Sequence, residues 1–414
     1  MSKTITCFST VDFHKPGGET IRISGIVNAL ASKGMRINFV HANKLHENVK
    51  HEQSTVLPQS FRTLNKRKFQ FVLTYGGVET VNFLFKKLLA DAKRVFATID
   101  GPVIFFNHLD ISIGYWLFRN KIISSYIIDV HGISHLEFDL NETKSPLTWA
   151  MNQVKKQTAL TLEKKIYRNA TKILYTSKGV QDHVERLYGL NQKQALIVEE
   201  SINQLLLDQS IDEQLRNHLI EKHQLNQQDG VLLFAGSFKQ FGGIIDLIKA
   251  YVKLQHDEPK VKTKLLLVGD GPLFAYCKQM LDGEGSVRND VVFLGRQAYE
   301  KLKTFHAIAD IIICPDKDTY YSQILPHIKY FDAISSGKIV INGAFQFTEE
   351  MNPNQRFSLN FTPSDVDSLA DTMKYAVLNK EPLLARYQNA RKEATALYNY
   401  EHTVEPLYQW LIHR

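Results

Sequence analysis

The stretch SQILPHIKYFDAISSGKIVING, residues 322–343, decides the fold. Pro326 suits the first turn of a helix, and Gly337 suits the left-handed turn that ends one. The apolar residues 339–341 then predict a buried strand. Lys329 and Asp332 lie three positions apart, so they share one face near the helix start, where backbone N–H groups favour an anion. The stretch therefore predicts a helix, a tight turn and a strand, with a charged pair at the helix start.

Similar units lie on both sides of this stretch. Near the N-terminus, residues 3–13 predict a strand, residues 14–34 a glycine-rich turn and a helix that Gly34 ends, and residues 35–42 a second strand. Alternating strands and helices with apolar strands predict a parallel sheet that helices cover on both faces. Further strands of this first half are predicted at residues 69–76, 101–108, 124–132 and 172–177.

The pattern restarts after a polar, glutamine-rich stretch, residues 204–229. The fold class is therefore α/β, with two Rossmann-like parallel-sheet domains. We expect an N-terminal domain over residues 1–203 and a C-terminal domain over 204–390, with 204–229 as the boundary region. Residues 391–414 end in a helix whose Tyr408 and Trp410 are suited to packing on another surface. Strands of the second domain are predicted within 230–238, 263–273, 290–295, 310–316 and 338–343.

Composition narrows the classes of function. The chain has 414 residues, 44% hydrophobic and 22% charged, which is ordinary for a soluble protein. Its three cysteines, Cys7, Cys277 and Cys314, are far apart in the sequence and odd in number, which indicates neither a disulfide framework nor a metal cluster and fits a reducing compartment. No run of 18 apolar residues and no signal-peptide pattern is present, so a cytoplasmic protein is expected. The formal charge of +7 favours anionic partners, but no basic stripe with stacking aromatics indicates nucleic acid.

Three motifs each allow two interpretations. In KPGGET, Gly17 and Gly18 lie between a strand and a helix, where the backbone can approach a phosphate; turn geometry alone also explains them. In YIIDVHG, His131 follows a strand, where it can bind a substrate oxygen or simply the loop backbone. In LLLVGDGPL, Gly269 and Gly271 indicate either a dinucleotide loop or a tight turn, and the third glycine of the dinucleotide motif is missing.

The order of motifs adds what no single motif gives. FAGSF, LLLVGDGPL, VVFLGRQ, ADIIICPD and LPHIKYFDAISSGKIVI follow one another as in the GT-B glycosyltransferases, and the chain most resembles the retaining glycosyltransferase family 4. The resemblance implies two domains facing each other across a cleft, with the C-terminal helix returning to the first domain. It also implies a UDP- or GDP-sugar donor, a saccharide or lipid-linked acceptor, retention of configuration, and neither a metal nor a protein nucleophile.

The resemblance also assigns roles to residues. Asp332 corresponds to the acid that binds the ribose hydroxyls of the donor nucleotide, and Lys329 to a lysine that meets the diphosphate. His131 corresponds to the catalytic-site histidine that contacts the transferred sugar near its 6-hydroxyl. Arg296 is expected near the nucleobase. The other donor-site residues are expected near the diphosphate: Gly17, Gly18, Gly236, Ser237 and Lys239.

Some positions depart from the family pattern. Ile324 stands where many members have a glutamate, Ser237 where they have an arginine, and Gly242 or Gly243 where they have a lysine. A diphosphate leaving group requires positive charge, so either Lys239 and Lys329 supply it or the site is degenerate. In the second case the chain would be a non-catalytic binding subunit that partners an active glycosyltransferase. A nucleotide-sugar epimerase is a third hypothesis, but it requires more acid–base groups than His131.

Two basic, apolar segments of the first domain bear on the acceptor. Residues 64–71 and 81–95 combine lysines and arginines with phenylalanines and leucines. A basic amphipathic helix can lie on an anionic membrane, which would place the protein on the inner membrane face in the synthesis of cell-surface polysaccharide. A core-facing helix with solvated lysines explains the same pattern.

Overall fold

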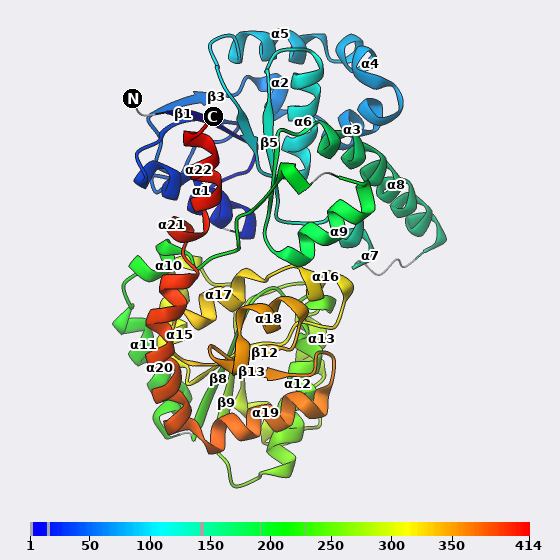
Figure 1. Cartoon of the computed structure of the whole chain (residues 1–414). Coiled ribbons are helices and arrows are strands. Elements are labelled where there is room, and N and C mark those ends of the chain that lie inside the picture. Colours follow the sequence, from blue (N-terminus) through cyan, green and yellow to red (C-terminus); the bar gives the residue numbers. More distant parts are fainter. Residues whose placement is uncertain (1–2, 15–16, 141–144, 191, 228) are drawn as a thin grey trace. The chain divides into compact units, whose positions relative to one another are not determined.

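The structure is a computed structural model that describes residues 3–14, 17–140, 145–190, 192–227 and 229–414 (Figure 1). The chain divides into two compact units. The first unit is Met1–Glu200 together with Tyr400–Arg414, and the second unit is Ser201–Asn399. The chain thus crosses between the units at 200/201 and 399/400, where the sequence predicts 203/204 and 390/391. No helix within the described ranges is long and apolar enough to cross a membrane.

A seven-stranded parallel sheet forms the centre of the first unit, in the order β3-β2-β1-β4-β5-β6-β7. The order reverses direction between β1 and β4, which makes the carboxyl ends of these two strands the switch point where open α/β sheets bind ligands. The strands are β1 Thr4–Ser9, β2 Arg36–His41, β3 Gln53–Val56, β4 Val103–Phe105, β5 Tyr126–Val130, β6 Lys172–Tyr175 and β7 Ala195–Ile197.

Helices of the first unit include two at the C-terminal end of the chain. Leu407 and Leu411 are buried in the same core as Ile23 and Leu30, so this end of the chain packs on the N-terminal unit. The helices are α1 Gly18–Ser32, α2 Gln59–Arg62, α3 Lys66–Tyr75, α4 Gly77–Leu84, α5 Lys86–Val95, α6 His108–Arg119, α7 Ser134–Asp139, α8 Pro146–Asn169, α9 Lys178–Tyr188, α21 Tyr400–Thr403 and α22 Glu405–Ile412.

The strand predicted at residues 69–76 is wrong, because this segment lies in helix α3. Large apolar residues occupy every second position from Phe69 to Tyr75, which is typical of a strand. The structure buries Phe69 and Leu73, which are four apart and share one helix face, while Phe71 and Tyr75 are exposed on another. Asn65 caps the helix by accepting from the Lys68 backbone N–H. The alternating pattern fits a strand, but the segment forms a helix that begins after a good N-cap residue.

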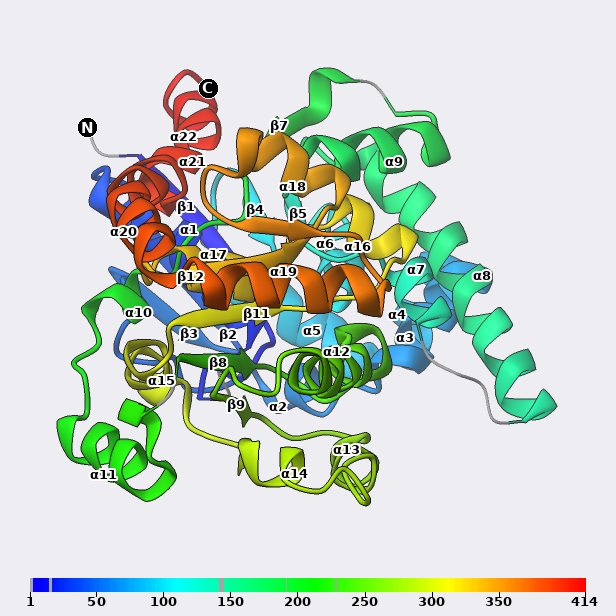
Figure 2. The ribbon, with the colours of Figure 1, turned by 90° about the horizontal axis from the view of Figure 1, so that it is seen from below.

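The second unit has a six-stranded parallel sheet in the order β10-β9-β8-β11-β12-β13, with its switch point between β8 and β11. Successive strand residues are buried on opposite faces: Leu232 in one core and Leu233 in the other. Helices α12 and α19 lie next to each other on the first of these faces (Figure 2). The strands are β8 Gly230–Ala235, β9 Thr263–Val268, β10 Val291–Gly295, β11 Ile311–Cys314, β12 Ile339–Gly343 and β13 Leu359–Phe361.

The predicted boundary region 204–229 is largely helical and belongs to the second unit, because α11 packs against α15. Eleven α-helices of this unit lie within the described residues. They are α10 Gln204–Asp208, α11 Glu213–His223, α12 Ile244–Asp257, α13 Phe274–Gln279, α14 Val287–Asp290, α15 Leu302–Ile308, α16 Tyr320–Ile324, α17 Ile328–Ile334, α18 Gln346–Met351, α19 Val366–Leu378 and α20 Lys380–Leu397.

The stretch 322–343 folds as a helix, a turn and a strand, with one correction. Pro326 does not start the helix: α17 begins at Ile328, and Pro326 lies in the short connection after α16. Gly337 has a φ of +73°, as its place in a left-handed turn predicts, and β12 follows it. Lys329 is therefore the second residue of the helix, and Asp332 lies one turn further on.

Candidate functional site

Lys329 lies at the switch point of the second unit. Its Nζ donates to Asp316 Oδ1 at 2.7 Å and lies 5.7 Å from the centre of the Phe234 ring. Phe234 belongs to β8 and Asp316 follows β11, so the ammonium group bridges the two strands between which the sheet order reverses. The Lys329 side chain is 25% exposed and that of Asp316 is 2% exposed. A solvent-accessible positive charge thus lies where an open α/β sheet binds its ligand.

Asp332 is buried on the same helix and has a different partner. Both of its carboxylate oxygens accept from the Tyr299 hydroxyl, at 3.1 and 3.2 Å, and Asn203 Nδ2 donates to that hydroxyl at 3.0 Å. Burial, and then the charge of Asp332, hold the pKa of Tyr299 above its ordinary range, so the hydroxyl stays protonated. Lys329 and Asp332 therefore share a short helix, and each is held by a residue from elsewhere in the unit.

Three charged groups surround Cys314 at the end of β11. Burial raises the pKa of its thiol to about 12, Lys329 lowers that pKa, and Asp316 and Asp332 raise it. All three side chains are thus close to the same strand end. Asp316 is a residue that the sequence reasoning missed, although its place directly after the apolar strand 311–314 could have indicated it. Its second oxygen, Oδ2, is buried and has no donor among the described residues.

The loop after β8 carries three of the predicted donor-site residues. Gly236 N–H donates to the Val268 carbonyl at 2.9 Å, which fixes the loop against the neighbouring strand β9. Ser237 and Lys239 are exposed beyond this anchor, and Lys239 Nζ lies 5.7 Å from the centre of the Phe241 ring. Gly269 has a φ of +141°, and a Cβ there would lie 1.8 Å from the Gly236 carbonyl oxygen. The tight-turn interpretation therefore accounts for Gly269.

Gly243 is one of the two positions at which the resemblance predicts a lysine. Its φ is +69°, and a Cβ would lie 1.5 Å from the Pro315 carbonyl oxygen. No side chain fits there, because the loop after β8 lies directly against the loop after β11. At Gly242 a Cβ would lie 3.2 Å from the Ser237 carbonyl oxygen, which is tight but less severe. The glycine at position 243 thus allows the loops after β8 and β11 to lie in direct contact at the switch point.

Two other predicted positions differ in exposure. Arg296 is exposed and follows β10, the outermost strand of the sheet, so it lies at the edge of this unit. Ile324 is buried at the end of α16 and contributes only apolar surface. The structure therefore brings Lys329 and Asp332 together with the loops that carry Gly236 and Gly243, and it does not bring a carboxylate to position 324.

In the first unit, His131 follows β5 and is held by an acid two residues before it. Its Nδ1 lies 2.8 Å from Asp129 Oδ2, and its side chain is 13% exposed. Asp129 is fully buried; burial alone would raise its pKa, but Arg22 and His131 outweigh burial and hold the pKa below its ordinary range. His131 thus has one ring nitrogen committed to a carboxylate at the carboxyl end of a strand.

Gly17 and Gly18 lie at the start of α1, next to the unit's switch point. Gly17 is the N-cap residue, with an extended φ of −165°, and a Cβ there would meet no atom of the described residues within 4 Å. Neither backbone conformation nor packing requires glycine at this position. The turn-geometry interpretation is therefore not supported at Gly17, while close approach of a ligand stays a prediction.

Two polar residues of the first unit escaped the sequence reasoning. Asp110 is buried and accepts from Thr10 N–H at 3.0 Å and Thr10 Oγ1 at 2.7 Å; burial outweighs these bonds and raises its pKa to about 7. Burial alone would lower the pKa of His108, but Glu137 and Glu163 raise it to about 9. Both residues follow β4, so they lie at the same sheet edge as His131. Their place directly after the apolar strand β4 could have indicated both residues in the sequence.

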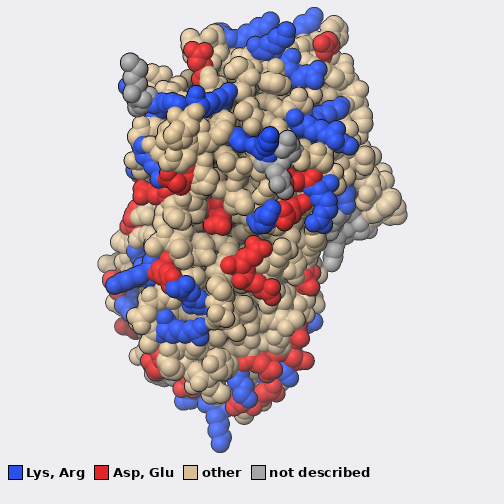
Figure 3. All heavy atoms as spheres, in the orientation of Figure 1, with Lys and Arg blue, Asp and Glu red and all other residues tan. Residues whose placement is uncertain are grey.

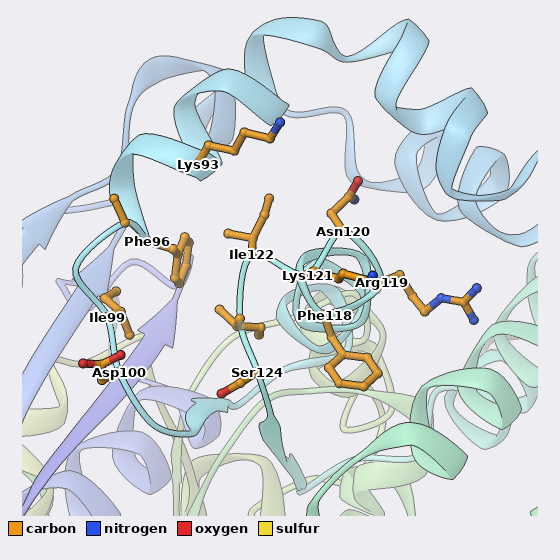
Figure 4. A pocket seen from close by; sticks show the side chains of 12 residues that line it. Lys93, Phe96, Ile99, Asp100, Phe118, Arg119, Asn120, Lys121, Ile122 and Ser124 are labelled. Carbon is orange, nitrogen blue, oxygen red and sulfur yellow. The ribbon is translucent and has the colours of Figure 1, made fainter.

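A hollow of about 790 Å³ in the first unit does not coincide with these residues. Figure 4 shows its lining, which includes Lys93, Phe96, Asp100 and Ile122. Asp100 precedes β4 and Ser124 precedes β5, so the hollow lies at the amino ends of the strands. Ligands of open α/β sheets bind at the opposite, carboxyl ends.

Known proteins resemble this chain in sequence and in fold. Residues 215–393 match the family model described as glycosyl transferases group 1. The lipopolysaccharide 1,2-N-acetylglucosaminetransferase of Salmonella typhimurium is 25% identical over 191 residues, which are 43% of this chain and 46% of that protein. The match thus spans about half the length of this relative.

Solved structures resemble the chain over its whole length. A sucrose-phosphate synthase from Thermosynechococcus elongatus is 20% identical, with 99% of each chain covered and a TM-score of 0.69. Anabaena Alr3699/HepE, in complex with UDP and glucose, is 15% identical, with 100% of each chain covered and a TM-score of 0.72. These similarities show the fold. The chain therefore has the GT-B fold, and residues 215–393 of its second unit resemble the glycosyl transferases group 1 family.

Proposed function

We propose that the chain is a glycosyltransferase that moves a sugar from a nucleoside-diphosphate sugar to a saccharide or lipid-linked saccharide acceptor. The observation that carries the proposal is the Lys329–Asp316 pair at the switch point of the unit that matches the glycosyl transferases group 1 family model. A diphosphate leaving group gains charge as its bond breaks, and a fixed cation stabilises that charge. The relative from Salmonella is named as a sugar transferase, which supports the same class of reaction.

The donor would bind at the carboxyl edge of the second sheet. Lys329 would contact the diphosphate, and the exposed Ser237 and Lys239 of the loop after β8 would lie along it. Asp332 would accept from the ribose hydroxyls, because a carboxylate has two oxygens and can accept several hydrogen bonds. Arg296, at the edge strand, would lie near the base. UDP is favoured over GDP because a neighbour of the same fold binds UDP.

The first unit would supply the groups that meet the transferred sugar and the acceptor. His131 would bind a sugar hydroxyl. The backbone at Gly17 and Gly18 would approach the diphosphate, because no contact among the described residues requires glycine at position 17. We further propose retention of configuration without a protein nucleophile or a metal. The leaving phosphate would accept the proton of the attacking hydroxyl on the same face of the sugar.

A binding panel tests the donor site. The melting temperature of the chain is measured with UDP, GDP and their sugars, for the wild type and for Asp332→Ala and Lys329→Ala. A ligand at about 100 times its dissociation constant stabilises the folded state by about 2.7 kcal/mol, which is easily measured. We expect one nucleotide to stabilise the wild type and to stabilise both variants distinctly less. Equal stabilisation of the wild type and both variants would place the donor elsewhere.

The departures from the family pattern favour a second candidate, a non-catalytic subunit that binds a sugar or a partner transferase. Ile324 is buried, and Gly243 admits no side chain, so two expected polar groups are absent. Hydrolysis of the donor by the isolated chain, measured as release of the nucleoside diphosphate, separates the two. Turnover that is lost in Lys329→Ala supports the transferase, whereas binding without any turnover supports the subunit.

Contact with a membrane is a further proposal about the acceptor. Phe83 is 69% exposed on α4, and Leu147 and Trp149 are 71% and 56% exposed on α8. Lys and Arg side chains gather over the part of the first unit where α3, α4 and α5 lie (Figure 3). Phe83, which has Lys86 Nζ 5.0 Å from the centre of its ring, suits an anionic lipid surface. Co-sedimentation with vesicles of phosphatidylglycerol, but not phosphatidylcholine, and its loss in Phe83→Ser/Trp149→Ser, are expected.

A further inference from the structure

Asp129, the partner of His131, is held in turn by a buried arginine. Arg22 Nε lies 2.9 Å from Asp129 Oδ2 and 3.1 Å from Oδ1, and Arg22 Nη2 donates to Oδ1 at 2.7 Å. Arg22 Nη2 also donates to the Val198 carbonyl at 2.8 Å. Neither side chain of the ion pair is exposed at all. The carboxylate therefore has one oxygen fixed by arginine and the other shared between arginine and His131.

The network continues from Arg22 to the two points where the chain crosses between its units. Arg22 Nη1 lies 3.6 Å from Glu200 Oε2, and the Tyr400 hydroxyl donates to Glu200 Oε1. Glu200 is the last residue of the first unit before the chain leaves it, and Tyr400 is the first residue after the chain returns.

Tyr400 reaches Glu200 because α1 leaves space for its ring. A Cβ on Gly25 would lie 2.2 Å from a ring carbon of Tyr400, so only glycine allows the ring to lie against the helix. Burial, and then the charge of Glu200, hold the pKa of Tyr400 above its ordinary range, which keeps its hydroxyl a donor. The contact is thus built into the packing of α1 against the C-terminal segment.

We propose that Asp129, Arg22, Glu200 and Tyr400 are positioning residues that hold His131 in the tautomer with its proton on Nδ1. Nε2 is then the ring nitrogen left to accept from a substrate hydroxyl; this use of Nε2 rests on the proposed function, whereas the tautomer does not. Because the network ends at Glu200 and Tyr400, the histidine is anchored to both crossings of the chain.

The substitution Asp129→Asn tests whether Asp129 determines the tautomer of His131. In Asp129→Asn, Arg22 still requires an acceptor, so the amide oxygen stays toward the guanidinium. The amide NH₂ then replaces Oδ2 opposite His131 and donates to Nδ1. A nitrogen that accepts cannot carry the proton, so the imidazole must change to the Nε2–H tautomer.

The tautomer can be read directly. In protein labelled with ¹⁵N-histidine, two-bond ¹H–¹⁵N correlations at pH 8.5, where an ordinary imidazole is neutral, show which ring nitrogen carries the proton. The His131 signal is identified by its absence in His131→Gln. The Nδ1–H pattern is expected in the wild type and the Nε2–H pattern in Asp129→Asn. An unchanged Nδ1–H pattern in folded Asp129→Asn would overturn the role of Asp129.

A milder variant tests the far end of the network and serves if Asp129→Asn does not fold. Tyr400→Phe removes only the hydroxyl that donates to Glu200, and a measurable fraction of Nε2–H tautomer is expected at His131. Tyr126→Phe is the matched control. It removes a buried hydroxyl that donates to the Ile166 carbonyl at 2.6 Å, from the same strand as Asp129.

The outcomes separate this inference from the proposed function. Mixed tautomers in Tyr400→Phe with a single tautomer in Tyr126→Phe support the network. A single Nδ1–H tautomer in both variants would show that Glu200 and Tyr400 do not position the histidine. Neither measurement uses a donor or an acceptor, so failure to detect glycosyl transfer leaves the result intact.

Discussion

Lys329→Ala is the substitution that tests the donor site most directly. A hydrogen bond to a charged group contributes about 1.5–3 kcal/mol, which corresponds to a dissociation constant about 10- to 150-fold higher when the bond is lost. Two unit charges 4 Å apart near a protein surface interact by about 4 kcal/mol, so this range is physically reasonable. Asp316, 2.7 Å from the ammonium, already uses part of that interaction, which favours the lower end of the range.

A substitution of Asp316 is expected to change the affinity for the nucleoside diphosphate in the opposite direction. Asp316→Asn keeps an acceptor for Lys329 but removes a negative charge beside the proposed diphosphate, so tighter binding of the nucleoside diphosphate is expected. Lys374→Ala is the matched control, because Lys374 lies on α19 and pairs with Glu258, at the end of α12. The dissociation constant of Lys374→Ala for the nucleoside diphosphate should equal that of the wild type.

Titration calorimetry with UDP and GDP measures these constants. Lys329→Ala leaves the carboxylate of Asp316 buried without its cation and is expected to unfold at a lower temperature, so the titrations are run well below the melting point of each variant. The reasoning would be refuted if Lys329→Ala bound the nucleotide as tightly as the wild type, or if Asp316→Asn bound it more weakly.

Two further predictions concern stability. Gly243→Ala should prevent stable folding, because its Cβ would overlap the Pro315 carbonyl, whereas Gly17→Ala should melt like the wild type and lose only nucleotide affinity; scanning calorimetry with and without UDP checks both. His108 has a folded-state pKa of about 9, above its ordinary value, so its contribution to stability is complete below about pH 6.5 and is lost as pH rises through 9. Urea unfolding of the wild type and His108→Gln should differ at pH 6 and converge at pH 10, and a constant difference would contradict the assignment.

Apolar periodicity predicts the two sheets because parallel strands are buried on both faces. Residues 230–235 and 263–268 show this, since adjacent residues enter opposite cores. The edge strands β3, β7 and β13 escape prediction because they are short, and β3 is exposed along its whole length. Helix α3 escapes it because its buried residues, Phe69 and Leu73, fit both a strand and a helix pattern.

Only part of the site could be predicted from the sequence. Lys329 and Asp332 were found because they share one local element, the helix before β12. Asp316 and Tyr299 were missed because each reaches that helix from a different segment, and only the sheet order places the end of β11 beside β8. The same holds for Arg22, which is separated from Asp129 by 107 positions in the chain.

The packing at Gly243 and the position of Lys329 are related. The loop after β8 closes on the Pro315 carbonyl, and Gly243 leaves no room there for a side chain. Positive charge at the switch point must then come from another element, and Lys329 supplies it from α17. Since Asp316 offsets that charge in the absence of ligand, binding a diphosphate would require Lys329 to divide its hydrogen bonds between the two. A site of this kind favours a ligand with more than one negative charge, because a single one gains little over the carboxylate already present.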